Sequence, residues 1–218
     1  QVFREPIQLE AITDQGLNID ELDSLVESGL ARQADSDTYD VHDLIREFLL
    51  QSLDTQAKEE LHNKAVVWYE KQPSSSQISL ELIYHLISSS RHEDATSIII
   101  DEGRDLVKEG HIELLGLLES IDTKSVNAEG ACRIDRLRGE VLALLGRFDE
   151  AEEAFNQARP PAEATGLKDV IADILSNLAD IALKRGDSES SLGMHRKALE
   201  LFIELKDAVG AARSCLLY

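Results

Sequence analysis

Apolar residues recur with helical spacing along most of the chain. Ala57, Leu61 and Ala65 lie four residues apart, so all three fall on one face of a predicted helix. The predicted exception is a β-hairpin, in which residues 30–34 and 38–41 pair across a short acidic turn. The pattern therefore predicts a mainly α protein that contains one small β-hairpin.

Specific residue types mark the helix boundaries near the start of the chain. Asn18 precedes an apolar run and Glu21 follows three residues later, which is the pattern of a capping box. Gly29 suits the position just after the end of this helix. The order helix, helix, hairpin over residues 1–55 resembles a winged-helix domain whose first helix is partly missing. Asp40 is the predicted cap of the helix that follows the hairpin.

The end of the chain repeats with a period of 40 residues. Gly146 and Gly186 occupy the same place in two copies, as do Ala158 and Ala198, and a third copy begins near Ala208. Two helices joined at a small residue, with alanine at a fixed place on the second helix, are typical of tetratricopeptide repeats. The period is longer than the usual value of about 34 residues, so we expect longer helices or loops.

The repeats complete a predicted division of the chain into three parts. Residues 1–55 form a partial winged-helix domain, residues 56–130 a helical linker or stalk, and residues 131–218 tetratricopeptide-like repeats that are incomplete at the C-terminus. The predicted fold class is therefore mainly α, with a partial winged helix, an α-helical linker and a helical-repeat solenoid. The first residue is not an initiator methionine, so we interpret the chain as a fragment of a longer protein.

The chain is strongly acidic, with 42 acidic residues, 22 basic residues and a formal net charge of −20. Such a chain repels nucleic acid and anionic membranes on average, and it suits basic partners or a salt-rich solution. Residues 1–55 contain three basic and thirteen acidic side chains, whereas contacts to DNA phosphates favour cationic donors. We therefore expect the winged helix to contact protein and not to bind DNA directly.

The candidate chemistry is sparse. No run of eighteen apolar residues is present, so no membrane span is predicted. Cys132 and Cys215 lie far apart and are interpreted as free, small apolar residues, which fits a reducing cytoplasm. The six histidines show no zinc-binding spacing, and the sequence contains neither a glycine-rich phosphate loop nor a G-x-S-x-G segment. The residues alone predict no enzyme, no metal site and no cofactor in this chain.

The most specific motif is Val41-His42-Asp43, where the predicted hairpin passes into a helix. A histidine beside a helix N-terminus can donate a hydrogen bond to a phosphate or carboxylate, or it can simply pack within its own domain. The motif resembles the Met-His-Asp motif of the signal-transduction ATPases with numerous domains, the class that includes NB-ARC and maltose-regulator-type proteins. Val41 replaces the usual Met.

This resemblance implies a nucleotide-dependent role that the chain cannot perform by itself. His42 would contact the β-phosphate of ADP, and the nucleotide-binding domain of the parent chain would be its partner. ADP or ATP with Mg²⁺ would be cofactors of that parent. Tyr84-His85-Leu86 and the segment 91–95 resemble the helical stalk of maltose-regulator-like members, and the repeats resemble their sensor arm.

In a tetratricopeptide stack, the first helix of each pair lines a concave groove. The residues at predicted groove-facing positions are Arg133, Arg136, Glu140, Asp173, Ser176, Asp180 and Arg213. They are candidates for binding a protein or peptide partner. Alternatively, they are solvated charges on an exposed helix face, or arginine and aspartate pairs that bridge neighbouring copies.

Three functional hypotheses remain at this point. The first is the regulatory and ligand-sensing fragment of a nucleotide-switched signalling ATPase, in which a partner on the repeats shifts an equilibrium between two states. The alternative is a nucleotide-independent helical-repeat adaptor that binds a protein partner. A DNA-binding regulator is a third hypothesis, and the acidity of residues 1–55 argues against it. A phosphate-loop motif upstream of Gln1 would favour the first.

Overall fold

The computed structural model describes residues 6–14 and 16–216, and it contains twelve helices and one small antiparallel sheet within these ranges. The mainly α fold predicted from the sequence is confirmed. The chain divides into two compact units, residues 1–91 (unit 1) and residues 92–218 (unit 2). The boundaries predicted at residues 55 and 130 were drawn on sequence pattern, and the three-part division stays a prediction.

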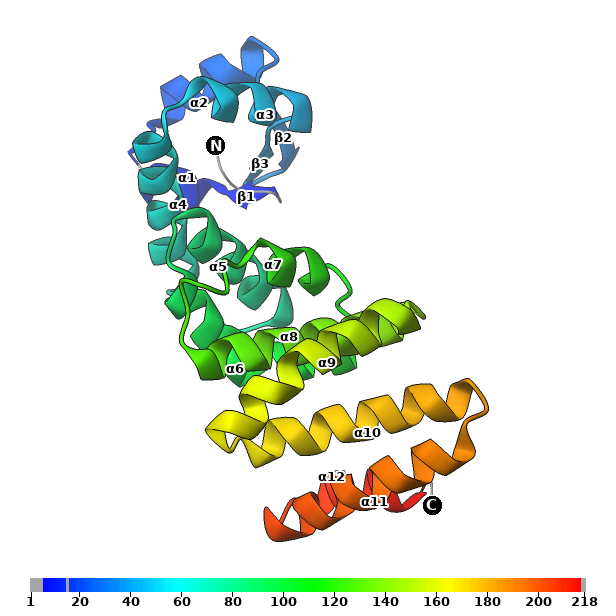
Figure 1. Ribbon diagram of the computed structural model, residues 1–218. Helices are drawn as coiled ribbons and strands as arrows, with labels where there is room; N and C mark the ends of the chain where they lie inside the picture. The colour runs from blue at the N-terminus through cyan, green and yellow to red at the C-terminus, as the bar shows by residue number, and fades with distance from the viewer. Residues whose placement is uncertain (1–5, 15, 217–218) are drawn as a thin grey trace. The chain divides into compact units, whose positions relative to one another are not determined.

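Unit 1 begins with a three-stranded antiparallel sheet (Figure 1). Its elements are β1 (Ile7–Gln8), α1 (Leu9–Asp14), α2 (Ile19–Glu27), β2 (Arg32–Asp35), β3 (Thr38–Asp40), α3 (Asp43–Ser52), α4 (Thr55–Tyr69) and α5 (Ser76–Ser88). The strand order is β1-β3-β2, and Tyr39 pairs with Ile7 on one side and with Gln33 on the other. The predicted hairpin therefore exists, and β1 adds a third strand that the sequence pattern did not reveal.

Helix α2 has the boundaries that its residue types predict. The Asn18 side chain accepts a hydrogen bond of 2.8 Å from the Glu21 amide, and the Glu21 carboxylate accepts one of 3.1 Å from the Asn18 amide. Gly29 follows the helix with a φ of +73°, a conformation that favours glycine because it has no Cβ. The predicted capping box and helix stop are confirmed.

Helices α4 and α5 pack together as an antiparallel pair that shares its core with the sheet. Ala65 and Tyr69 of α4 belong to the same buried cluster as Ile7, Leu22 and Tyr39. The hydrophobic side of α4 thus completes the core of unit 1 together with the sheet-bearing segment that precedes it in the sequence. The serine-rich stretch at residues 74–76 leads from α4 into α5, and these two helices pack against each other. The core of unit 1 therefore spans residues on both sides of position 55.

A buried histidine pair lies between α4 and α5. The Nδ1 atoms of His62 and His85 are 2.9 Å apart, and both side chains are buried. One ring must donate its proton and the other must accept, so this contact requires that at least one of the two imidazoles is neutral. Burial lowers the pKa of His62 from 6.5 to about 4, which favours that neutral form.

Unit 2 consists of helices that alternate in direction along the chain (Figure 1). They are α6 (His92–Glu109), α7 (Leu114–Ser120), α8 (Ala128–Leu144), α9 (Phe148–Thr165), α10 (Lys168–Lys184), α11 (Ser188–Glu204) and α12 (Ala208–Leu216). Helices α8, α10 and α12 begin 40 residues apart, at 128, 168 and 208, and so do α9 and α11, at 148 and 188. The predicted period is confirmed, and helices of 17 or 18 residues in the two complete pairs account for its length.

Close packing inside the first repeat depends on a glycine. A Cβ built on Gly139 of α8 would lie 2.6 Å from the ring of Phe155 on α9, and both residues are buried. The second repeat has Ala179 and His195 at the positions 40 residues later. The first repeat therefore combines a large ring with glycine, whereas the second combines the smaller ring of histidine with alanine.

Replacing Gly139 by Ala is expected to lower the free energy of unfolding of unit 2 by about 1–3 kcal/mol, because the added methyl group must displace the Phe155 ring. Gly193→Ala on α11 is the control, since a Cβ there meets nothing within 4 Å. That variant is expected to raise stability by about 0.5–1 kcal/mol, the normal gain for alanine in a helix. Thermal unfolding followed by circular dichroism measures both, and shifts of the same sign would contradict the packing argument.

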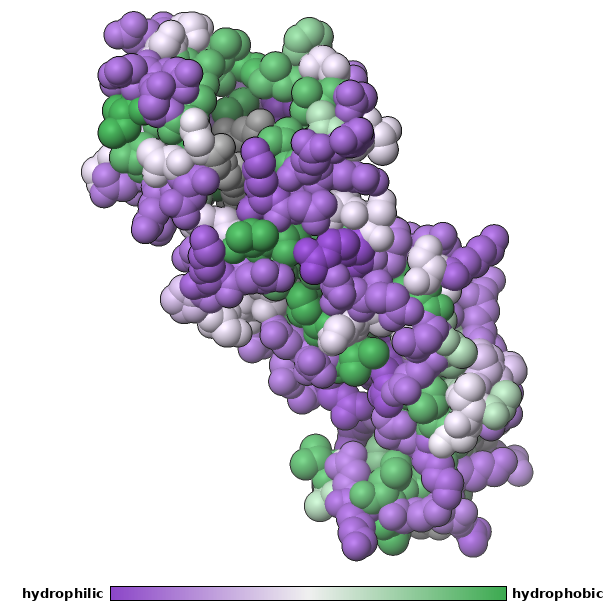
Figure 2. Space-filling model, turned by 90° about the vertical axis from the view of Figure 1, so that its left-hand side faces the viewer, coloured by the Kyte–Doolittle hydropathy of each residue, from purple (hydrophilic) through white to green (hydrophobic). Residues whose placement is uncertain are grey.

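On the face drawn in Figure 2, hydrophilic side chains predominate and apolar side chains form separate patches. Within residues 6–14 and 16–216, every helix is too short or too polar to cross a membrane. The same residues bring together no group of three or more histidine, cysteine, aspartate or glutamate side chains that could hold a metal ion.

Candidate functional site: the inner groove of unit 2

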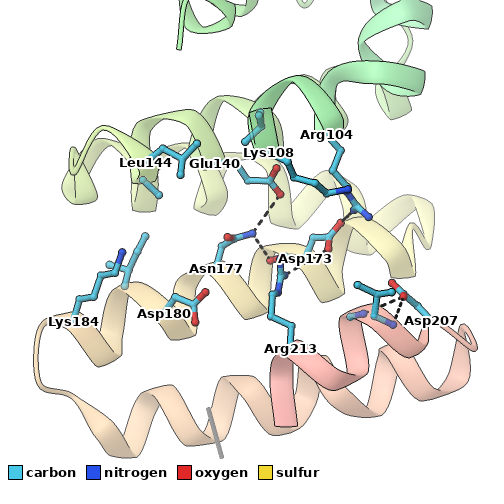
Figure 3. A pocket seen from close by; sticks show the side chains of 15 residues that line it. Arg104, Lys108, Glu140, Leu144, Asp173, Asn177, Asp180, Lys184, Asp207 and Arg213 are labelled. Atoms are coloured by element: carbon cyan, nitrogen blue, oxygen red, sulfur yellow. Dashed lines mark hydrogen bonds and ion pairs between the residues drawn. The ribbon is translucent and has the colours of Figure 1, made fainter. Parts of the chain in front are cut away.

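The first helices of successive pairs line a groove of about 580 Å³ in unit 2 (Figure 3). Helices α8 and α10 belong to the two complete repeats, α12 opens the third, and α6 precedes them. The charged and amide side chains that line the groove are Arg104, Lys108, Glu140, Asp173, Asn177, Asp180, Lys184, Asp207 and Arg213. The groove is therefore a polar surface that four helices build together.

Asp173 is the centre of this surface. Its side chain is buried, and Arg104 of α6 donates a hydrogen bond to its Oδ2 atom. Arg136 of α8 lies 3.7 Å from Oδ2, and Arg213 of α12 lies 3.8 Å from Oδ1. Burial raises the pKa of the Asp173 carboxyl, and the guanidinium groups of Arg136 and Arg104 oppose that rise. Three guanidinium groups from three helices therefore converge on one carboxylate.

The repeat period explains why charges alternate at this place. Arg133, Asp173 and Arg213 occupy the same position in three successive copies, 40 residues apart. Each first helix thus presents a charge opposite to that of its neighbour at the same level. Arg213 pairs with Asp173, whereas Arg133 turns to Asp169 and Glu129 instead, at 2.7 and 2.9 Å.

A second carboxylate neutralises the most deeply buried of the three arginines. The Glu140 carboxylate accepts a hydrogen bond of 2.6 Å from Arg136, whose side chain is only 6% exposed. The Asn177 amide lies between the two acids, and it donates 2.9 Å to the backbone carbonyl of Asp173 and 3.4 Å to Glu140 (Figure 3). These contacts hold Arg136, Glu140 and Asp173 in place before any ligand arrives.

Near Asp180, a buried histidine lies beside the groove. His195 of α11 is fully buried, and its Nε2 atom lies 3.3 Å from Asp180 Oδ1, although the geometry is not that of a hydrogen bond. Burial raises the pKa of the Asp180 carboxyl and lowers the pKa of the His195 imidazole. The first repeat has Phe155 at the place of His195, so the second repeat has a polar contact where the first has an aromatic one.

Of the seven residues that the sequence placed at groove-facing positions, the structure brings four to the groove: Glu140, Asp173, Asp180 and Arg213. The other three do not line it. Arg136 lies behind Glu140, Ser176 is fully buried, and Arg133 pairs along the edge with Asp169. The period predicts which helix face points inward, but burial along that face varies from one copy to the next.

Arg104 was missed by the sequence argument because it lies in α6, within the predicted linker. Helices α6 and α7 both pack against α8, and α7 is much shorter than α9 and α11. The start of α6 lies 36 residues before the start of α8, and this spacing is the feature from which a further groove-lining helix could be predicted. It was hidden because the short α7 interrupts the 40-residue pattern.

In unit 1, the structure corrects the predicted start of α3. Asp40 is not the N-cap, because its carboxylate is engaged by Arg32 at 2.7 Å and by Arg46 at 3.3 Å. His42 takes that place, and its Nδ1 atom accepts a hydrogen bond of 3.3 Å from the Leu44 amide. A strand residue with two cationic partners is thus unavailable as a cap.

Arg46 stabilises the junction between β3 and α3. Its guanidinium contacts the carboxylates of Asp40 and Asp43 and donates a hydrogen bond of 3.0 Å to the Val41 carbonyl. Because Nδ1 of His42 is an acceptor, the proton of the neutral imidazole resides on Nε2. His42 is exposed, so the fold leaves an N–H donor beside the N-terminus of α3.

Helix α3 also exposes its apolar side. Leu44 and Phe48 are each 70% exposed, and Leu49 is 42% exposed. The helix buries Arg46 on its other side, against Asp40. Leu44 and Phe48 therefore do not face the core of unit 1, whereas Leu50 of the same helix packs against it.

Comparison with known proteins supports the repeat assignment. The tetratricopeptide repeat family model matches residues 130–213. A search of curated proteins found no match. The crystal structure of BtubC (BKLC) from P. vanneervenii is similar with a TM-score of 0.47 and 19% identity, over 77% of this chain and 66% of that one.

A second similar structure is a signal-transduction ATPase with numerous domains from Pyrococcus horikoshii that has a tetratricopeptide repeat sensor. Its TM-score is 0.40 and its identity 21%, over 99% of this chain and 38% of that one. The chain thus spans less than two thirds of the length of either structure. The family match identifies residues 130–213 as tetratricopeptide-like repeats, a fold that generally serves as a protein-interaction surface.

Proposed function

We propose that this chain is the regulatory and ligand-sensing part of a nucleotide-switched signalling ATPase, and that the groove of unit 2 holds its protein ligand. The observation that carries the proposal is the groove itself. It places partly exposed charges from four helices around the buried Asp173 carboxylate, within a tetratricopeptide-like stack. Stacked helix pairs form the extended concave surfaces that bind protein segments. A cytoplasmic location is part of the proposal.

The nucleotide part of the proposal rests on His42. In a parent protein, the exposed Nε2–H would donate a hydrogen bond to a phosphate of ADP held by the nucleotide-binding domain. ATP or ADP with Mg²⁺ would supply the energy difference between two states of that parent. A ligand in the groove would shift the parent toward the state in which this hydrogen bond is broken, provided that it binds that state more tightly.

His42→Ala in the parent protein is expected to release ADP about 10- to 100-fold faster, because a charge-assisted hydrogen bond contributes roughly 1.5–3 kcal/mol. Release of a fluorescent ADP analogue, measured by stopped flow, gives the rate. His42→Asn is the matched variant, since asparagine caps a helix as well as any residue but lacks the outward ring N–H. If Asn retains ADP as the native protein does, His42 is only a helix cap and the switch role is wrong.

A nucleotide-independent adaptor is the second candidate. The observation that favours it is that the residues lining the groove all lie within unit 2, between positions 104 and 213. In that case partner binding in the parent protein would not depend on whether ADP or ATP is present. Equal partner affinity in the two nucleotide states, measured by titration calorimetry, would favour the adaptor over the sensor.

A further inference from the structure

Two arginines in the groove have more hydrogen-bond donors than the fold uses. The side chains of Arg104 and Arg213 are 45% and 44% exposed, although both lie against the buried Asp173 carboxylate. Each guanidinium has five N–H donors. Within the described residues, Arg104 donates one hydrogen bond to Asp173, and Arg213 makes an ion pair with Asp173 at 3.8 Å and interacts electrostatically with Asp180. Both side chains line the groove, so donors that Asp173 does not use can be reached there.

The position of the two arginines suits a second carboxylate. Arg104 contacts one oxygen of Asp173 and Arg213 lies beside the other, so their guanidinium groups flank the same carboxylate (Figure 3). They come from α6 and α12, the two outer helices of the groove, and Asp173 comes from α10 between them in sequence. A carboxylate placed above Asp173 would be within reach of both guanidinium groups. Planar, bidentate contacts of this kind are the strongest that arginine makes.

The charge balance of the groove differs from that of the whole chain. Four cationic and four anionic side chains line it, whereas the chain has 22 basic and 42 acidic residues. Arg136 adds a further positive charge directly behind Glu140. Asp207 is occupied as the cap of α12, and Asp180 lies against His195. The local surface around Arg104 and Arg213 is therefore the part of the groove where an anion is favoured.

Apolar side chains line the same groove. Leu144 of α8 is 59% exposed and Val209 of α12 is 81% exposed. An isolated anion would not cover them, but an extended peptide would, because alternate side chains of an extended chain point in different directions. The groove thus combines donors for a carboxylate with apolar surface for a neighbouring side chain.

We propose that the groove binds an extended acidic segment of a partner protein, in which one carboxylate lies on Arg104 and Arg213 and an adjacent apolar side chain contacts Leu144 or Val209. This inference rests on the proposed role of the groove in holding a protein ligand, and it adds the chemistry of that ligand. Arg104 contributes from outside the residues that match the repeat family.

The proposal is tested by the binding of two nonapeptide libraries to the chain of residues 1–218. The peptides carry fluorescein, and their termini are blocked. Both libraries have Leu or Val at alternate positions, and the remaining positions are Asp or Glu in one library and Asn or Gln in the other. Fluorescence polarisation is expected to show binding of the acidic library at least about tenfold tighter than that of the amide library. Arg104→Gln and Arg213→Gln are each expected to weaken acidic binding by about tenfold, whereas the Lys variants retain part of it.

Arg196→Gln is the matched control, because Arg196 is an exposed arginine of α11 that pairs with Glu200 away from the groove. It is expected to leave the affinity unchanged, and circular dichroism checks that each variant is folded. Equal binding of the two libraries would overturn the acidic preference while leaving a protein-binding groove intact. Failure of both libraries to bind, or acidic binding that survives both Gln variants, would also overturn it. None of these outcomes depends on ADP release, which tests the nucleotide part of the proposed function separately.

Discussion

Asp173→Asn is expected to lower the free energy of unfolding of unit 2 by about 3 kcal/mol. The substitution removes the one carboxylate on which Arg104, Arg136 and Arg213 converge. Breaking a buried ion pair by removing one partner typically costs about 3–5 kcal/mol, since the remaining charge loses both water and its counter-ion. We expect the lower end of this range, because Glu140 still neutralises Arg136 and the other two arginines retain access to water.

The measurement can separate the two units. Trp68 is the single tryptophan of the chain and lies in α4, so its fluorescence reports on unit 1. Urea unfolding followed by circular dichroism should show the loss, while the Trp68 transition should move little. Glu163→Gln, which removes an exposed partner of Arg159, is the control and should leave both transitions nearly unchanged. An Asp173→Asn variant as stable as its parent would mean that the three arginines are held by other contacts.

Unit 1 is expected to lose about 2 kcal/mol of stability between pH 7 and pH 5 through His62 alone. The pKa of His62 is lowered by burial from 6.5 to about 4, so between these values the unfolded chain binds the proton more tightly. Stability therefore falls as the pH falls through this window, and it is almost fully recovered about one pH unit above 6.5. A proton on both Nδ1 atoms would also break the contact with His85, which is 2.9 Å long.

Urea unfolding followed by Trp68 fluorescence across pH 4.5–7 measures this dependence. Other groups face the pair, namely Glu81, whose carboxylate lies 4.0 Å from His85, and the rings of Tyr69 and Tyr84. We therefore compare the pH dependence of the free energy of unfolding in the native protein with that in His62→Gln, which keeps a hydrogen-bonding side chain. Glu60→Gln on the exposed side of the same helix is the control for general carboxylate titration. Identical pH slopes in native and His62→Gln proteins would show that His62 does not contribute.

The sequence predicted the features that depend on neighbouring residues. Asn18 and Glu21 form the capping box that their spacing indicated, and Gly29 ends that helix. The 40-residue period placed helix starts at equivalent positions in both repeats. These features succeed because a cap, a stop or a helical stripe is decided within one or two turns of the chain.

The sequence also predicted part of the candidate site, because the repeat period shows which face of each helix points inward. The period identified the inner face of α8, α10 and α12, and so it found Glu140, Asp173, Asp180 and Arg213. It did not show that Arg136 would be buried or that Arg133 would pair along the edge. Exposure along a helix face depends on which side chains the neighbouring helices bring, and no local pattern contains that information.

Only the tertiary structure decided which partners the charged side chains choose. Arg104 reaches Asp173 across 69 positions, and Arg32 and Arg46 occupy the Asp40 carboxylate, so that His42 caps α3 in its place. In each case a carboxylate had several possible partners, and burial together with helix packing selected among them. The sequence by itself thus determined the helices, the capping box of α2 and the repeat period. Packing in three dimensions determined which residue caps α3, which charges meet in the groove and which of them stay partly exposed there.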